Sequence, residues 1–208
     1  MKIAVLGSTG QTGRLLVAQA LARGHEVTAL ARTPDRLTGL TGDALRTVRA
    51  DVAEPSTVLA AVEGADVVVS GLGITKKQDP SVLVEGARLI ASAAPRVIWL
   101  SSLGMGETQG ALGRVNGALL KRLLRHEWDA KGVSGEAVRA AGGTVVYAGP
   151  LTNRPYAGGG RLVPAGEFAP RLIPPAAPRA GVAALMLGEA EEPWIGAAAA
   201  VALFDRRG

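Results

Sequence analysis

The chain opens with Lys2-Ile3-Ala4-Val5-Leu6-Gly7-Ser8-Thr9-Gly10-Gln11-Thr12-Gly13, a short apolar run that ends in a glycine-rich turn. A helical pattern of apolar residues follows at once, over residues 15–21. Strand, glycine turn and helix in this order form the context in which glycines bind a dinucleotide. Backbone without Cβ can approach a pyrophosphate, and the N–H groups of the first helical turn point at it. The predicted cofactor contacts in this stretch are Gly7, Ser8, Thr9, Gly10, Gln11, Thr12 and Gly13.

Short apolar runs alternate with helical segments along the first 150 residues, which indicates βαβ units and a parallel sheet. Strands are expected at 2–6, 26–31, 45–50, 66–70, 96–101 and 144–148. Helices are expected at 11–23, 55–62 and 81–93, with a helical region over 111–141 that is interrupted near Gly132–Gly135. The pattern predicts an α/β fold of the Rossmann type, doubly wound, with a mostly parallel sheet and helices on both faces.

The amino-acid composition changes after Pro150, and Pro, Gly and Ala dominate as far as residue 178. A helix is expected at about 179–187 and a strand at 199–204. This part is too short and irregular to hold its own core. We therefore expect one domain over 1–208, with a cofactor-binding core over 1–150. Residues 151–208 are expected to form a small, irregular substrate-side cap that completes the sheet.

Composition narrows the classes of function. The chain has 208 residues, 48% of them apolar, no cysteine and a net charge of +5. Without cysteine there is no disulfide or thiolate metal site, which fits a cytoplasmic protein; no metal site and no membrane partner are expected.

The basic residues are scattered apart from a cluster at Arg114, Lys121, Arg122, Arg125, His126 and Lys131. With only 3% aromatic residues, the chain lacks the stacking groups of a nucleic-acid surface, so no nucleic-acid partner is expected. Nothing in the pattern indicates an oligomeric state.

Arg32 stands at the end of the second expected strand, 19 residues after Gly13. An acidic residue at this place would bind the ribose 2′-hydroxyl of NAD, whereas the planar donor fork of arginine suits a 2′-phosphate. Arg32, with Thr33 and Arg36 beside it, therefore favours NADP(H) over NAD(H). The alternative is an ordinary surface arginine in a loop.

Three more strand ends carry candidate site residues, because ligands of open α/β sheets bind at the carboxyl ends of the strands. They are Asp51 and Val52, then Gly71, Leu72 and Gly73, then Ser101 and Ser102. Each group has a structural alternative. Asp51 suits a turn or a helix cap near Pro55, the glycines suit a plain turn, and a serine at a strand end can cap backbone.

The spacing Gly7-x-x-Gly10-x-x-Gly13 resembles the short-chain dehydrogenase/reductase superfamily, in its atypical and extended branches. The resemblance implies that Asp51 and Val52 lie against adenine. It also implies that Ser101 and Ser102 lie near the nicotinamide as catalytic residues, where a hydroxyl polarises the substrate. Two later stretches, 144–153 and 179–183, resemble the NAD(P)H-binding group that contains biliverdin reductase B/flavin reductase and the NmrA-like proteins. In the second stretch Gly181 stands where that group has aspartate.

The Tyr-x-x-x-Lys pair of the common short-chain dehydrogenases is absent. The only tyrosines are Tyr147 and Tyr156, and Lys131 has Glu127 four residues before it. His126, Trp128 and Lys131 lie in the right part of the chain, but no spacing selects one of them.

Flavins and quinones suit such a site, because they accept a hydride with a proton drawn from solvent. The resemblance therefore implies an NADPH-dependent oxidoreductase acting on such a small acceptor, which Lys76, Lys77, Arg154 and Arg161 could meet if it is anionic. The alternative is a non-catalytic NAD(P)H-binding redox sensor of the NmrA-like type, acting through a protein partner. A sugar-nucleotide epimerase is disfavoured, because it needs the tyrosine.

Overall fold

The computed structural model describes residues 1–75, 77–113, 117–118, 121–122, 124–171, 173–193 and 198–204. These residues form an eight-stranded sheet in the order β3-β2-β1-β4-β5-β6-β10-β8, parallel except for β8, which runs antiparallel to β10. The strands are β1 (Lys2–Leu6), β2 (Glu26–Ala31), β3 (Leu45–Arg49), β4 (Val67–Ser70), β5 (Val97–Ser102), β6 (Thr144–Ala148), β8 (Gly160–Pro164) and β10 (Ala199–Phe204). A separate short pair joins β7 (Leu151–Thr152) to β9 (Ala177–Pro178).

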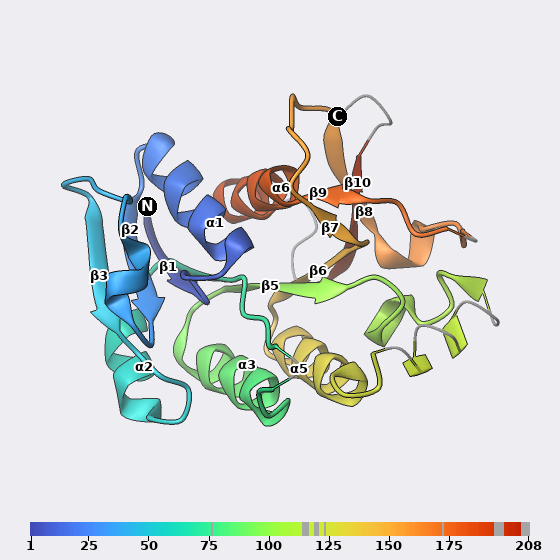
Figure 1. Ribbon diagram of the computed structural model, residues 1–208, viewed down its shortest axis with the longest axis horizontal. Coiled ribbons are helices and arrows are strands. Elements are labelled where there is room, and N and C mark those ends of the chain that lie inside the picture. Colours follow the sequence, from blue (N-terminus) through green and yellow to red (C-terminus); the bar gives the residue numbers. More distant parts are fainter. Residues whose placement is uncertain are drawn as a thin grey trace.

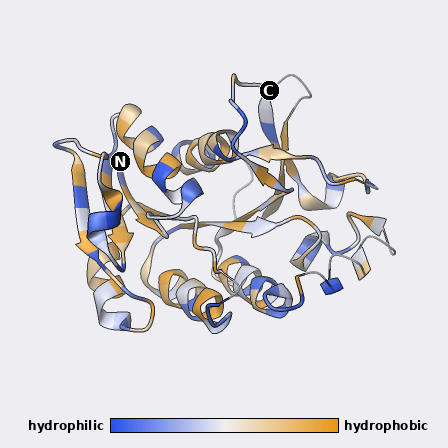
Figure 2. Cartoon of the chain, in the orientation of Figure 1, coloured by the Kyte–Doolittle hydropathy of each residue, from blue (hydrophilic) through white to orange (hydrophobic). Residues whose placement is uncertain are grey.

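Helices cover both faces of the sheet (Figure 1). On one face lie α1 (Gln11–Ala22) and α6 (Arg179–Glu191), and on the other lie α2 (Pro55–Val62), α3 (Ser81–Ala93) and α5 (Trp128–Ala140). Short 3-10 turns are η1 (Pro34–Leu37), η2 (Gly106–Thr108) and η3 (Ala165–Glu167). Figure 2 shows hydrophobic and hydrophilic stretches alternating around the helices, as amphipathic helices on a sheet require.

The core divides into two clusters, one on each face, because side chains alternate along a strand. In β1, Ile3 and Val5 belong to the cluster that holds α1 and α6 residues. Ala4 and Leu6 belong to the cluster under α2, α3 and α5. The predicted doubly wound, mostly parallel fold is thus confirmed, with strand ends within one residue of those expected.

Two expectations about elements were wrong. The helical region is not interrupted near Gly132–Gly135, since α5 runs through both glycines. Gly135 faces β6, where an added Cβ would lie at an ordinary contact distance of 3.5 Å from the Tyr147 hydroxyl, and the helix continues through it unbroken. The helix expected at 179–187 continues to Glu191, and β8 adds an edge strand inside the stretch taken as irregular. The candidate residues Lys76 and Arg114 lie outside the described residues.

Among the described helices, none combines the length and the apolar character that crossing a bilayer would need. The described residues also contain no group of three or more His, Asp or Glu side chains placed to hold a metal ion.

Candidate functional site

A cavity of about 440 Å³ lies at the carboxyl ends of the parallel strands. It begins beside β2 and β3, passes the ends of β1, β4 and β5, and reaches Ala148 and Gly149 after β6. The strand order reverses between β1 and β4, which is the switch point where open α/β sheets bind their ligands. The strand ends singled out in the sequence therefore meet around one cavity.

The glycine turn between β1 and α1 forms the floor of this cavity. Gly7 has a φ of +75°, and a Cβ added to it would lie 2.8 Å from backbone atoms of Leu72. Gly10 caps α1 without a side-chain hydrogen bond, and the first turn of α1 holds no acidic residue. Its backbone N–H groups are therefore left for a ligand, and the positive end of the helix dipole faces the same space. This cradle fits a diphosphate.

The residues of the glycine turn divide into two groups. Those that line the cavity are Gly7, Thr9, Gly10, Gln11 and Thr12. Ser8 is fully buried and its Oγ donates to the Leu30 carbonyl at 2.6 Å, while Gly13 packs directly against the Gly7 carbonyl. Ser8 and Gly13 shape the turn from behind.

Arg32 lines the cavity at the end of β2 and is exposed. Thr33 is also exposed and lies outside the cavity lining. The following turn η1 is tied to the first part of α1, because Arg14 donates to the carbonyls of Arg36 at 2.7 Å and Thr38 at 2.8 Å. This fixes the segment beside Arg32 to the helix that begins at the glycine turn.

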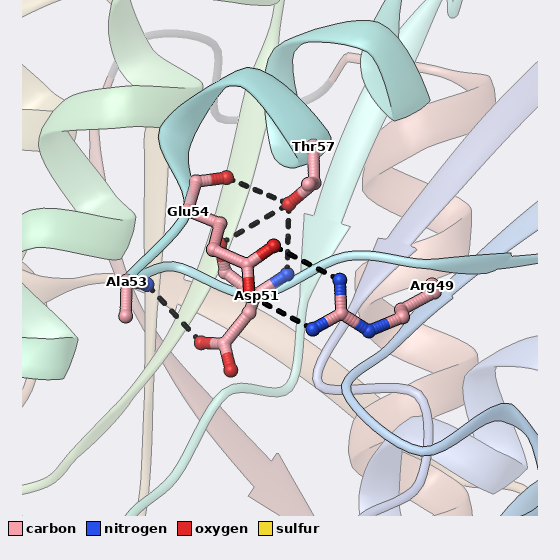
Figure 3. Close-up of polar contacts among 5 residues, drawn as sticks. All are labelled: Arg49, Asp51, Ala53, Glu54 and Thr57. Atoms are coloured by element: carbon pink, nitrogen blue, oxygen red, sulfur yellow. Dashed lines mark hydrogen bonds and ion pairs between the residues drawn. The ribbon is translucent and has the colours of Figure 1, made fainter.

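Asp51 follows β3 and serves as a turn residue, one of the structural alternatives foreseen for it, while the cap of α2 is Glu54 (Figure 3). Its Oδ1 accepts from the Ala53 N–H at 3.1 Å, which closes a turn, and its own N–H donates to Thr57 Oγ1 at 3.0 Å. Asp51 nevertheless lines the cavity. Beside it Arg49 donates to both oxygens of Glu54 at 2.9 and 2.8 Å, and this hydrogen bonding lowers the pKa of the Glu54 carboxyl.

The loop after β4 forms the cavity wall opposite the glycine turn. Gly71, Leu72 and Gly73 line the cavity, as does Val52. A Cβ on Gly71 would lie 3.3 Å from the Gly13 nitrogen, so the two loops are in close contact. The four residues predicted here therefore lie where a ligand could touch them.

Ser101 and Ser102 end β5, and both line the cavity. Ser102 Oγ accepts from Lys131 Nζ at 2.8 Å, and Lys131 Nζ lies 3.2 Å from Glu127 Oε2. Ser101 is only 5% exposed, and its Oγ has no hydrogen-bond partner among the described residues. Lys131 also lines the cavity, so the structure selects it from the three side chains that spacing could not separate.

Neither tyrosine replaces the missing one. Tyr147 is buried away from the cavity lining, with its hydroxyl accepting from the Glu107 N–H at 3.4 Å. Burial raises its pKa above the ordinary value, so the phenol stays protonated near neutral pH. Tyr156 packs edge-on against Phe204, with ring centroids 5.8 Å apart.

Arg179, the first residue of α6, is a cavity residue that sequence reasoning missed. Its Nη1 donates to Asn153 Oδ1 at 2.8 Å. Lys77 and Arg154, which were considered as contacts for an anionic acceptor, lie outside the lining of this cavity, and Arg161 lines a separate shallow one beside β8.

Comparison with known proteins identifies a family and a shared fold. A family model described as NAD(P)H-binding matches residues 7–193. The isoflavone reductase homolog IRL of Zea mays is 34% identical over 95 residues, a match that spans 42% of this chain and only 31% of the relative.

Several solved structures share the fold at low sequence identity. The oxidoreductase ylbE from Lactococcus lactis is 18% identical with a TM-score of 0.82, over 99% of this chain and 91% of that one. ChuY, an anaerobillin reductase from Escherichia coli O157:H7, is 20% identical with a TM-score of 0.81, over 99% and 98%. A wide-type short-chain dehydrogenase/reductase from Veillonella parvula, solved with NADP, is 18% identical with a TM-score of 0.81, over 99% and 94%.

Proposed function

Since the chain belongs to the NAD(P)H-binding family, which its model matches over residues 7–193, we propose that it is an NADPH-dependent reductase of a small acceptor such as a flavin or quinone. One observation carries the proposal. A single cavity joins the glycine cradle of α1 to Ser101, Ser102 and Lys131. A nicotinamide cofactor and an acceptor could therefore meet in it. ChuY, a reductase, and the Veillonella protein, solved with NADP, share this fold and support the same assignment.

The residues present fit the cofactor. The turn of Gly7 and Gly10 would hold the diphosphate, because the first turn of α1 has no side-chain cap and no acidic residue to occupy its N–H groups. Arg32 and Asp51 would hold the adenosine half, and the loop from Gly71 to Gly73 would flank the other half. When bound, NADPH supplies a hydride, that is two electrons and one proton, and is left as NADP⁺.

Ser102 and Lys131 would deliver the proton that the acceptor needs in addition to the hydride. The Lys131 ammonium donates to Ser102 Oγ, so the serine can give its own proton to the acceptor and recover one from the lysine, which solvent recharges. The Glu127 carboxylate, 3.2 Å from Lys131 Nζ, holds the ammonium group beside Ser102. Ser101 Oγ would hydrogen-bond the acceptor, since its own hydrogen bond is unmade.

We also propose that residues 151–208 act as the substrate-side cap of one unit, 1–208. In support, β8 and β10 extend the same sheet, and Leu151 and Arg179 line the same cavity as the glycine turn.

Replacing Arg32 with Ala is expected to weaken NADPH binding by about ten- to a hundredfold and to leave NADH binding within about twofold. A hydrogen bond to a charged group contributes about 1.5–3 kcal/mol, and only NADPH carries the 2′-phosphate. Fluorescence titration with both cofactors measures the two dissociation constants. Arg46→Ala, an exposed arginine on β3 outside the cavity, is the control. Equal losses for NADPH and NADH would contradict the assignment of Arg32.

Ser102→Ala and Lys131→Met are each expected to lower kcat for NADPH oxidation by about a hundredfold, the ordinary contribution of a positioned acid. The assay is steady-state NADPH oxidation with FMN, riboflavin and a set of quinones. Lys77→Met, which changes a lysine outside the cavity lining, is the control. Unchanged kcat in both variants would show that Ser102 and Lys131 do not deliver the proton. Tight NADPH binding with no turnover of any acceptor would instead support the redox sensor.

A further inference from the structure

We propose that the acceptor carries an anionic group, a carboxylate or a phosphate, and that Arg179 binds it. The inference rests on the reductase function proposed above and names the substrate class for the same cavity. Arg179 lines the cavity without belonging to any of the strand ends that form the cofactor half.

Arg179 and Arg32 lie at opposite ends of the cavity. Arg32 follows β2, whereas Arg179 follows β9, whose Ala177 N–H donates to the Pro150 carbonyl just after β6. Between β2 and β6 the sheet order passes β1, β4 and β5, which is roughly 19 Å at the usual strand spacing. With the diphosphate at α1 and the adenosine beside Arg32, the reactive ring would lie toward β4 and β5. Arg179 is therefore on the acceptor's side of that ring.

The acceptor end of the cavity carries excess positive charge. The ionisable residues that line the whole cavity are Arg32, Asp51, Lys131 and Arg179, and the last two lie toward the acceptor end. Lys131 has Glu127 as an ionic partner at 3.2 Å, whereas the Arg179 side chain donates to the neutral amide of Asn153 and has no carboxylate partner within the described part of the chain. Most of the guanidinium donors of Arg179 are thus left to bind something else.

The start of α6 adds to this charge. Its first turn contains no acidic residue and its cap, Pro178, makes no side-chain hydrogen bond, so the positive end of the helix dipole is uncompensated. A side chain is also excluded at Gly181, where an added Cβ would lie 2.9 Å from the Tyr156 ring and would contact Phe204. The aromatic pair therefore keeps an acidic residue away from Arg179.

A second, independent observation points to a ligand in the same space. Ser101 is only 5% exposed and lines the cavity. Its Oγ has no hydrogen-bond partner among the described residues. A buried hydroxyl without a partner costs free energy unless a ligand or water completes it. An acceptor that bonds Ser101 at its reactive part and Arg179 at its anionic part would satisfy both groups.

Two pairs of acceptors test the proposal: FMN against riboflavin, and a naphthoquinone with and without a carboxylate substituent. Their members differ only in the anionic group. In the wild type the anionic member is expected to have the lower KM, and Arg179→Ala is expected to raise that KM by about tenfold with kcat and the neutral member unchanged. Arg179→Lys should keep part of the preference, and Arg154→Ala, outside the cavity lining, should keep all of it.

The same four compounds are titrated into protein saturated with NADP⁺, which gives a readout that does not need turnover. The inference is overturned if the neutral members bind as tightly as the anionic ones, if none of the four binds, or if Arg179→Ala leaves the preference intact. NADPH titration of the same samples separates the two proposals. Failure to bind NADPH would contradict the proposed function, whereas NADPH binding without a preference for the anionic acceptors would contradict only the role of Arg179.

Discussion

Gly13→Ala is expected to abolish NADPH binding and to lower the free energy of unfolding by about 3 kcal/mol, the upper range for an overpacked site. A Cβ at this position would overlap the Gly7 carbonyl and lie 2.8 Å from the Ser8 Cα. These backbone atoms cannot move away from the added Cβ, because Gly7 is itself in contact with Leu72 and Gly71 of the neighbouring loop. Relief requires the phosphate turn to change shape, so binding and stability fall together.

A matched control is Gly188→Ala, the same chemical change inside helix α6. A Cβ there would meet nothing within 4 Å, so the variant is expected to gain about 0.5–1 kcal/mol from helix propensity. Urea unfolding gives the stabilities and fluorescence titration gives the NADPH affinity. If Gly13→Ala binds NADPH within twofold of the wild type, the turn does not hold the diphosphate.

Local signals in the sequence were enough to predict which strand ends would meet around one cavity. The β1 strand, its glycine turn and α1 are contiguous, Arg32 and Gly71 each follow directly on an apolar strand, and Asp51 follows two residues after β3. Parallel strands bring their carboxyl ends to one edge, so position along the strand predicts position in the site. Around these strand ends the structure places the cavity.

The acceptor half depends on packing that no local pattern encodes. Lys131 reaches Ser102 across 29 residues only because α5 packs against β5 and α3. Arg179 enters the cavity because β9 pairs with β7, two strands of two residues each, which have no periodicity to detect. The error at Gly132–Gly135 has the same origin, because the packing of α5 on β5 and α3 keeps the helix continuous through two glycines.

Glu189→Ala is expected to lower the free energy of unfolding by about 3 kcal/mol, the lower end for a broken buried pair, because the Arg96 left behind is 22% exposed and keeps its carbonyl acceptors. The Glu189 side chain is fully buried, and its Oε1 accepts from Arg96 Nη2 at 2.9 Å and from Thr144 Oγ1 at 3.2 Å. Arg96 also donates to the main-chain carbonyls of Glu189 and Ala190 at 2.6 and 3.1 Å. The cluster therefore joins the amino ends of β5 and β6 to the last turns of α6.

The location of this cluster makes the prediction distinguishable from the first one. It lies at the opposite end of the strands from the cavity, so Glu189→Ala should retain NADPH affinity wherever it remains folded, unlike Gly13→Ala.

Glu54→Ala, which removes the exposed pair with Arg49, should change stability little, because solvent screens that pair. The double variant Arg96→Met with Glu189→Met should recover much of the loss, since apolar side chains can replace a buried pair. Urea unfolding of the four proteins measures these differences. A loss below about 1 kcal/mol for Glu189→Ala, the level of an exposed pair, would show that water reaches the cluster and that it does not hold α6 to the sheet.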